Sequence, residues 1–221
     1  MSDDNIEYFG KCELCKEVVK KRQMTRHLKN HFKNDTVTGG RDVEMYHLII
    51  EDKYAPMYWM HVEVPGVLTL EMLDAFLRNI WLECCGHLSC FTIDSQRYAS
   101  HPIEEMMFSL EEDDMNVKIE DVLDAKTKFQ HEYDYGSTTE LNLRVAGIRE
   151  TKVKKHAVKL LARNQPPEWK CAECGKPATL VEPKGWVVND ESVFCDDCAT
   201  DEEYCLPIVN SPRTGVCGYC G

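Results

Sequence analysis

Hydrophobic and polar positions alternate along two neighbouring stretches near the middle of the chain. The first stretch runs from Tyr46 to Ile50, and the second follows a short turn and runs from Tyr58 to Val64. Successive side chains of a β-strand point to opposite faces of the sheet, so a period of two predicts two paired strands with one apolar face.

After residue 68 a period of three to four replaces this alternation and predicts a helix. Thr69 can cap its N-terminus, and Gly86 can end it. Such a helix buries one side against another element. The apolar side of the predicted helix is formed by Leu70, Leu73, Phe76, Leu77, Ile80 and Trp81.

The second half of the middle region predicts further strands. We expect a strand over 88–94 and a short helix over 119–123. The acidic segment 104–116 is expected to form an exposed loop or an irregular helix. Alternation over 129–135 and again over 141–145, on either side of a turn, predicts a hairpin.

These elements predict four parts. We expect an N-terminal finger over 1–35 and an α+β domain over 42–150, with helices on one face of a mostly antiparallel sheet. A basic connector over 151–168, helical over 152–163, leads to a cysteine-rich module over 169–221.

Cysteine and histidine pairs predict that the first part is a zinc finger. Two residues separate Cys12 from Cys15, and three separate His27 from His31. A hairpin that carries two thiolates and a helix that carries two imidazoles one turn apart form a tetrahedral zinc site. A unit of this size seldom folds alone, so the metal is expected to supply its stability.

Two further Cys-x-x-Cys pairs predict a second zinc module, of treble-clef type. Cys171 and Cys174 form the first pair, and Cys195 and Cys198 form the second, with a hairpin between them. We expect these four thiolates to share one zinc ion, which makes two zinc sites in the chain.

A remaining group of three cysteines near the C-terminus lacks a fourth cysteine or histidine, which leaves the fourth position to Asp201, Glu202, Glu203, water or nothing. Several interpretations stay open for it: a possible third zinc, reduced packing cysteines, or an open catalytic zinc site. A redox dithiol is a further alternative for the last two residues. The group consists of Cys205, Cys217 and Cys220.

The cysteines and histidines of the middle region are interpreted as structural. Small thiols are common near a helix end, and isolated histidines on strands usually serve the fold. The sequence contains no glycine-rich phosphate loop, nucleophile elbow or His-Glu-x-x-His helix, so no catalytic residue is assigned. The residues interpreted in this way are Cys84, Cys85, Cys90, His61, His87, His101 and His131.

Charge is unevenly divided along the chain. The net charge of −12, from 26 basic and 38 acidic residues, argues against indiscriminate coating of nucleic acid. The finger is nevertheless basic, so its cations either contact phosphates or are simply solvated. The candidate contacts are Lys20, Lys21, Arg22, Arg26, Lys29 and Lys33, with the connector 152–163. A protein partner is expected at the acidic part of the middle domain, chiefly Glu104, Glu105, Glu111, Glu112, Asp113 and Asp114.

Several segments of the middle region match a known family. They are Val62-Glu-Val-Pro65, the helix from Thr69 to Trp81, His87-Leu-Ser-Cys-Phe91-x-Ile93 with Tyr98, and Phe129-x-x-Glu-Tyr133-Asp-Tyr135-Gly136. Through these segments, residues 46 to about 148 resemble the plasmid pRiA4b ORF-3-like family, often found beside transposons. The resemblance implies an α+β roll with a helix on a curved sheet, and it implies no established reaction.

From these features we expect a non-enzymatic zinc-binding accessory or regulatory factor that docks on nucleic acid or a nucleoprotein assembly. One alternative is a protein–protein adaptor whose zinc modules serve as rigid docking knobs. A second is a zinc enzyme that uses the group of Cys205, Cys217 and Cys220. No apolar run approaches the ~20 residues of a membrane span, and a cytoplasmic protein of archaeal or bacterial type is expected. The oligomeric state stays open.

Overall fold

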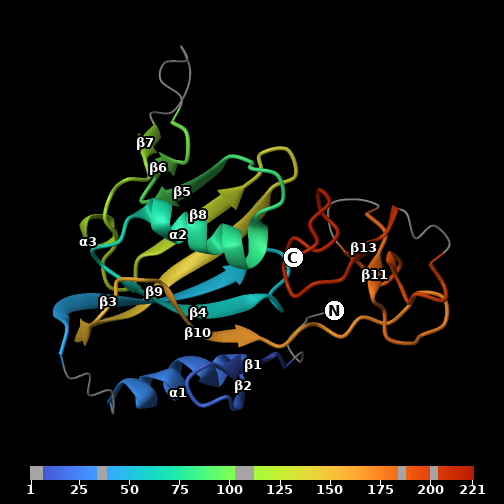
Figure 1. The fold of residues 1–221 in the computed structure, drawn as a ribbon, viewed down its shortest axis with the longest axis horizontal. Coiled ribbons are helices and arrows are strands. Elements are labelled where there is room, and N and C mark those ends of the chain that lie inside the picture. The colour runs from blue at the N-terminus through green and yellow to red at the C-terminus, as the bar shows by residue number, and fades with distance from the viewer. Residues whose placement is uncertain (1–6, 34–38, 103–111, 184–187, 200–203) are drawn as a thin grey trace.

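The computed structural model describes residues 7–33, 39–102, 112–183, 188–199 and 204–221. Within these residues the largest feature is a sheet of ten strands in the order β2-β1-β10-β4-β3-β9-β8-β5-β6-β7 (Figure 1). Neighbouring strands run antiparallel except for the pair β6 and β7. The strands are β1 (Phe9–Cys12), β2 (Val18–Lys20), β3 (Arg41–Asp52), β4 (Trp59–Pro65), β5 (Ser89–Ile93), β6 (Gln96–Ala99), β7 (Glu112–Asp114), β8 (Lys128–Tyr133), β9 (Thr139–Val153) and β10 (Lys159–Asn164).

The strands predicted from alternation pair as expected. Leu48 of β3 lies opposite Val62 of β4, and Phe129 of β8 lies opposite Leu143 of β9. The strand predicted over 88–94 is β5. The predicted α+β class with a mostly antiparallel sheet is therefore confirmed.

The predicted long helix is also present, and it covers one face of the sheet. It consists of α2 (Leu70–Leu77) and a π-helical turn, η1 (Arg78–Leu82). The Thr69 hydroxyl accepts a hydrogen bond from the Met72 backbone N–H at 3.4 Å, so Thr69 caps the helix as expected. The short helix α3 (Ile119–Val122) follows the prediction as well. In the described part of the chain no helix is both long and apolar enough to cross a membrane.

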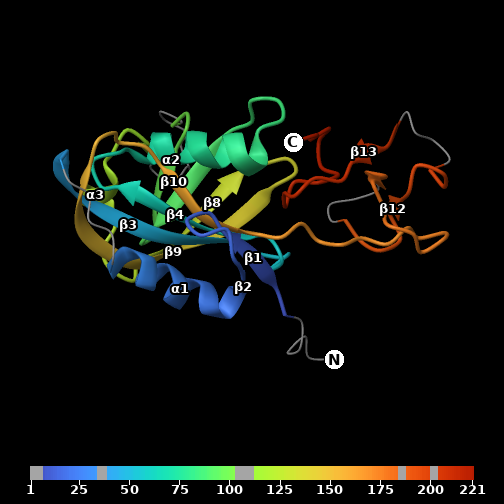
Figure 2. The same ribbon diagram turned by 60° about the horizontal axis from the view of Figure 1, so that its bottom comes forward.

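The finger is joined to the sheet of the middle domain. Its strand β1 pairs with β10 on one side and with β2 on the other. Its helix α1 (Lys21–Lys33) lies on the sheet face opposite α2, with the sheet between the two helices (Figure 2). Met24 and Leu28 of α1 are buried against Trp59 and Leu161 of the sheet. The finger therefore covers apolar surface that the sheet alone would expose.

The prediction of a helix over 152–163 is wrong. β9 extends to Val153, and β10 occupies 159–164 between β1 and β4. Leu161 and Ala162 of β10 are fully buried under the finger. The few apolar residues of this segment follow neither a helical nor a strand period, so pairing with β1 of the finger and with β4 decides the conformation.

The C-terminal module forms a small sheet of its own. Strands β11 (Leu180–Val181), β12 (Val193–Phe194) and β13 (Leu206–Pro207) pair in the order β12-β11-β13. A hairpin does precede Cys195, but its first strand is β11 and not the expected stretch 186–188, of which 186 and 187 lie outside the described residues. We also expect an acidic helix to follow Cys198 and to run through Tyr204, but residues 200–203 are likewise outside the described residues.

Replacing Gly10 with alanine is expected to destabilise the attachment of the finger. An added Cβ would collide with the Trp59 ring and would lie 2.5 Å from the Arg163 carbonyl oxygen. Overpacking of this kind costs about 1–3 kcal/mol, which urea denaturation can measure. Gly147→Ala in β9 is the control, because a Cβ there meets nothing within 4 Å. Equal losses for both variants would contradict the proposed contact.

Candidate metal centres

Four ligand atoms converge at the finger. Cys12 and Cys15 come from the β1–β2 hairpin, and His27 and His31 come from α1. The Cys15 Sγ lies 3.2 Å from His27 Nε2, which lies 3.2 Å from His31 Nε2, and Cys12 Sγ lies 3.8 Å from His31 Nε2. Tetrahedral coordination at ordinary metal–sulfur and metal–nitrogen distances separates ligand atoms by about 3.3–3.8 Å. The four residues can therefore hold one metal ion.

The local sequence explains this geometry. Lys16, directly after Cys15, adopts a positive φ of 67° and donates its backbone N–H to the Cys12 carbonyl oxygen at 2.8 Å, which closes the turn around both thiols. β2 ends at Lys20 and α1 begins at the next residue. His27 and His31 are four residues apart, so they project from the same side of α1.

A second group of four cysteines lies in the C-terminal module. Cys171, Cys174, Cys195 and Cys198 have sulfur atoms that all lie within 4.8 Å of one another. Gly175 follows the first pair with a φ of 72° and donates its N–H to the Cys171 carbonyl oxygen at 2.9 Å. The turn therefore has the same form as the turn in the finger, and the four thiols can hold one metal ion.

The acidities of these thiols also fit a cation site. A hydrogen bond from the backbone of Cys195 lowers the pKa of Cys171 to about 6, whereas the adjacent thiols of Cys174 and Cys195 raise the pKa of Cys198 to about 12. The Cys171 thiol therefore ionises readily, whereas the neighbouring cysteines oppose ionisation of the Cys198 thiol. A bound cation removes that opposition and allows all four to ionise.

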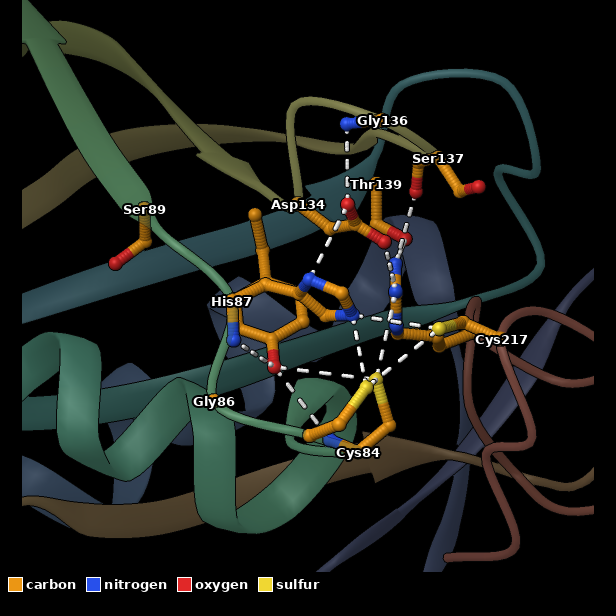
Figure 3. Close-up of polar contacts among 12 residues, drawn as sticks. Cys84, Gly86, His87, Ser89, Asp134, Gly136, Ser137, Thr139 and Cys217 are labelled. Atoms are coloured by element: carbon orange, nitrogen blue, oxygen red, sulfur yellow. Dashed lines mark hydrogen bonds and ion pairs between the residues drawn. The ribbon is translucent and has the colours of Figure 1, made fainter.

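The structure forms a third group, which the sequence analysis missed. Cys84, Cys85 and His87 follow η1, and Cys217 comes from the C-terminal tail, with all four ligand atoms within 4.8 Å of one another (Figure 3). The three residues of the middle domain were interpreted as structural. Only their short spacing and their position after a predicted helix could have indicated a site, because the fourth ligand is 130 residues away from His87.

The structure does not bring Cys205, Cys217 and Cys220 together, so the third zinc considered for these three residues is corrected. Cys217 lies beside Cys85, at 3.6 Å between sulfur atoms, and beside the imidazole of His87. Cys220 instead donates its thiol to the Gly218 carbonyl oxygen at 3.3 Å. The Cys217-x-x-Cys220 spacing is local, whereas the position of Cys217 is set by docking of the tail on the middle domain.

The other histidines belong to none of the three groups found among the described residues. His47 and His61 share a hydrogen bond of 2.8 Å on β3 and β4, and burial lowers the pKa of His47 to about 4. His131 lies 2.7 Å from a carboxylate oxygen of Asp74 and is fully buried. His101 is exposed.

The basic residues of the finger fall into two sets. Lys20 and Arg22 share Glu7 at 2.6 and 2.7 Å, and Lys21 lies 3.3 Å from Glu51. The second set is exposed on α1 and comprises Arg26, Lys29 and Lys33. Of the basic connector, Arg163 is turned inward and donates to the Asn210 carbonyl oxygen.

Most of the acidic segment expected to meet a protein lies outside the described residues, namely 103–111. Its end forms the edge strand β7, in which Glu112 accepts a hydrogen bond from Arg97 at 3.0 Å. Asp113 and Asp114 are exposed on that edge.

Comparisons with known proteins relate the chain to one family. No curated protein matches it. A crystal structure of a protein of unknown function, MM3350 from Methanosarcina mazei Go1, is similar with a TM-score of 0.46 and 19% sequence identity, covering 55% of this chain and 70% of that one. The family model of the plasmid pRiA4b ORF-3-like protein matches residues 45–182, which include the large sheet from within β3 to β10, without β1 and β2, and the first cysteine pair of the C-terminal module. The chain therefore belongs to the plasmid pRiA4b ORF-3-like protein family.

Proposed function

We propose that this protein is a non-enzymatic, zinc-binding accessory factor that docks on nucleic acid through the outer face of α1. The proposal rests on how α1 divides its surface. One side buries Met24 and Leu28 against the sheet, and another directs His27 and His31 to the thiols of the hairpin. The remaining side is exposed and basic.

Zinc suits the ligand sets of the finger and the C-terminal module. Thiolate and imidazole ligands in closed tetrahedral groups of four are typical of structural zinc. Neither group leaves a free position for a substrate, so these two ions would shape the protein and not catalyse a reaction.

The exposed side of α1 carries four basic residues in one row. Arg22, Arg26, Lys29 and Lys33 follow one another at intervals of three or four residues, which aligns them along a helix. α1 contains no acidic residue. A row of cations on the exposed side of a helix favours contact with a phosphate backbone.

The basic surface continues from α1 onto the sheet. A groove between the end of α1 and strands β3 and β9 is lined by Lys29, Lys33, Phe32 and Arg149, with Glu150 as its one acidic lining residue. The Arg149 guanidinium lies 4.7 Å from the centre of the Phe32 ring and is also paired with Glu63 at 2.6 Å. Arg149 thus adds a held, partly neutralised cation beside two lysines that form no ion pair with any of the described residues.

The residues at the base-reading positions of α1 predict only a weak preference for nucleic-acid sequence. In fingers that read bases, residues −1, 3 and 6 of the helix make the contacts, which correspond here to Lys20, Gln23 and Arg26. Lys20 is held by Glu7, and a single finger reads only ~3 base pairs. Phosphate contacts by Arg26, Lys29 and Lys33 would therefore supply most of the binding free energy.

The proposal predicts salt-dependent binding that a triple charge reversal removes. If three phosphates are neutralised, the logarithm of the association constant should fall against the logarithm of salt concentration with a slope of about −2.7 on duplex DNA. The variant Arg26→Glu, Lys29→Glu, Lys33→Glu should bind at least about tenfold more weakly and with a flatter slope. Fluorescence anisotropy with labelled DNA and RNA duplexes measures both quantities.

A matched variant separates this surface from net charge. Lys118→Glu, Lys126→Glu, Lys128→Glu changes the net charge equally at exposed positions outside α1 and outside the cysteine groups, so it should retain binding. Equal losses for both variants, or no binding to either nucleic acid, would contradict the proposal. Partners that copurify with the chain after nuclease treatment would instead favour the protein–protein adaptor.

A further inference from the structure

The loop after η1 and the C-terminal tail bring together four ligand side chains from distant parts of the chain. Cys84, Cys85 and His87 belong to the middle domain, and Cys217 belongs to the tail. Separations of 3.6 Å between Cys84 and Cys85 Sγ, 3.6 Å between Cys85 and Cys217 Sγ, and 3.3 Å between Cys217 Sγ and His87 Nε2 match a tetrahedral set. The Cys85 Sγ lies closer to His87 Nε2, at 2.9 Å. Tetrahedral zinc separates its sulfur and nitrogen ligands by about 3.3–3.8 Å.

The backbone at this place is shaped for convergence. Gly86 has a positive φ of 73°, and its N–H donates to the Glu83 carboxylate at 2.5 Å, which folds the 84–87 loop back on itself. Cys217 has a positive φ of 50° and lies between Gly215 and Gly218, which also have positive φ. Both segments are therefore tight turns that present thiols at their tips.

The imidazole of His87 is oriented by a carboxylate. Its Nδ1 lies 3.5 Å from the Asp134 Oδ1, and its Nε2 points to the sulfur atoms of the group (Figure 3). A carboxylate on one nitrogen of a metal-binding histidine fixes the ring and leaves the other nitrogen free for the ion. Asp134 is itself buried, so this orientation is firmly held.

The same carboxylate anchors the tail. Arg213 is fully buried and donates to the other oxygen of Asp134 at 2.5 Å. It also donates to the Ser137 carbonyl oxygen at 2.9 Å, to the Thr139 hydroxyl at 3.1 Å and to the Cys84 Sγ at 3.5 Å. Nearby, the Ser211 hydroxyl donates to the Trp81 carbonyl oxygen at 2.6 Å. The tail thus reaches the loop through buried polar contacts, and Cys217 is delivered to the group by a docked segment.

We propose that Cys84, Cys85, His87 and Cys217 form a third metal site, for a thiolate-preferring divalent cation of the zinc class, that fastens the C-terminal tail to the middle domain. Three thiolates and one imidazole complete a tetrahedral shell, so the site has no open position and its role is structural. It differs from the other two groups in that its ligands come from two parts of the chain, and the ion therefore bridges them.

Metal content of the full chain tests this proposal. Protein purified under reducing conditions with zinc should hold three ions per chain, one for each group. Cys217→Ser and, independently, Cys85→Ser should each lower the content from three to two. Both residues are exposed, so neither substitution should prevent folding. Native mass spectrometry with elemental analysis gives the count.

Cys220→Ser is the matched control. Cys220 belongs to the same Cys-x-x-Cys pair but lies outside the group, so this variant should keep all three ions. In the Cys217→Ser variant, hydrogen exchange should also increase over 206–219 while 128–145 stays protected. Two ions in the wild type, a loss with Cys220→Ser, or a non-reduced peptide map showing a disulfide between Cys85 and Cys217 would overturn the proposal.

Discussion

Replacing Cys12 with serine should remove one bound metal ion and unfold the finger. Cys12 is fully buried and is one of four ligands at that site. Metal binding contributes roughly 10–16 kcal/mol of apparent folding free energy in isolated finger peptides, and loss of a thiolate removes much of it. The finger buries only a small apolar cluster, in which Met24 and Leu28 meet Trp59, Leu161 and Ala162, and this contact alone cannot replace the metal.

The unfolding should be local. The main core between α2 and the sheet includes Leu48, Leu73, Phe91 and Leu143 and contains no residue of the finger. Hydrogen exchange read by mass spectrometry should therefore show loss of protection over 9–33 and 159–164, because β10 loses its partner β1. Protection over 128–145 should persist, and Trp59 fluorescence should shift as the ring becomes solvated.

Cys90→Ser is the matched control for the loss of a buried thiol. Cys90 is also fully buried, on β5, but it belongs to none of the three groups found among the described residues. It should lower stability modestly and leave the metal content unchanged. If Cys12→Ser kept full metal content, or if both variants changed the same segments, the finger would not be held by metal in the way the geometry indicates.

The sequence predicted those features whose causes are local. The ligands of the finger lie within one hairpin and one helix, so spacing alone brings Cys12, Cys15, His27 and His31 together. The helix cap at Thr69 and the spacing of apolar residues in the following helix are also determined by neighbouring residues. Such features need only backbone geometry, which neighbouring residues determine.

Features that depend on distant packing could not be predicted. Cys217 pairs with Cys220 in sequence, and only the docked tail shows that its neighbours are Cys85 and His87. Alternation along β4 places His61 and Glu63 on the face opposite its apolar one, and the sequence does not show that both residues are buried there. Their partners, a histidine and an arginine on β3 and β9, become apparent only from the pairing of the strands.

Replacing Asp74 with asparagine is expected to destabilise the middle domain strongly. Asp74 is buried on α2, where one carboxylate oxygen lies 2.7 Å from His131 and the other accepts from Arg78 at 2.6 Å. The Arg78 guanidinium also donates to the His87 carbonyl oxygen at 2.7 Å, so the network joins α2 to the loop that follows η1. Removing one partner of a buried ion pair costs about 3–5 kcal/mol. The asparagine amide keeps one acceptor oxygen, so the loss of stability in Asp74→Asn should lie near the lower end of this range.

The cost should depend on pH with a definite sign. Burial raises the pKa of Asp74, but the hydrogen bonds and charges of His131 and Arg78 outweigh burial and hold that pKa below its ordinary value. A carboxyl group with a depressed folded pKa contributes its stability in full above the unfolded value of about 3.9 and loses it as the pH falls through the folded pKa. The difference in unfolding free energy between wild type and Asp74→Asn should therefore be largest near neutral pH and shrink in acid.

Urea denaturation of both proteins from pH 7 down to about pH 3 measures that difference. Acid also releases the metal ions, but both proteins carry the same metal groups, so the stability lost in this way drops out of the difference. Glu120→Gln makes the same acid-to-amide change in an exposed ion pair with Lys118, at 2.9 Å, and should cost at most about 1 kcal/mol. A pH-independent difference for Asp74→Asn would mean that the variant loses packing and not charge. A loss no larger than that of Glu120→Gln would mean that the buried network does not hold α2 on the sheet.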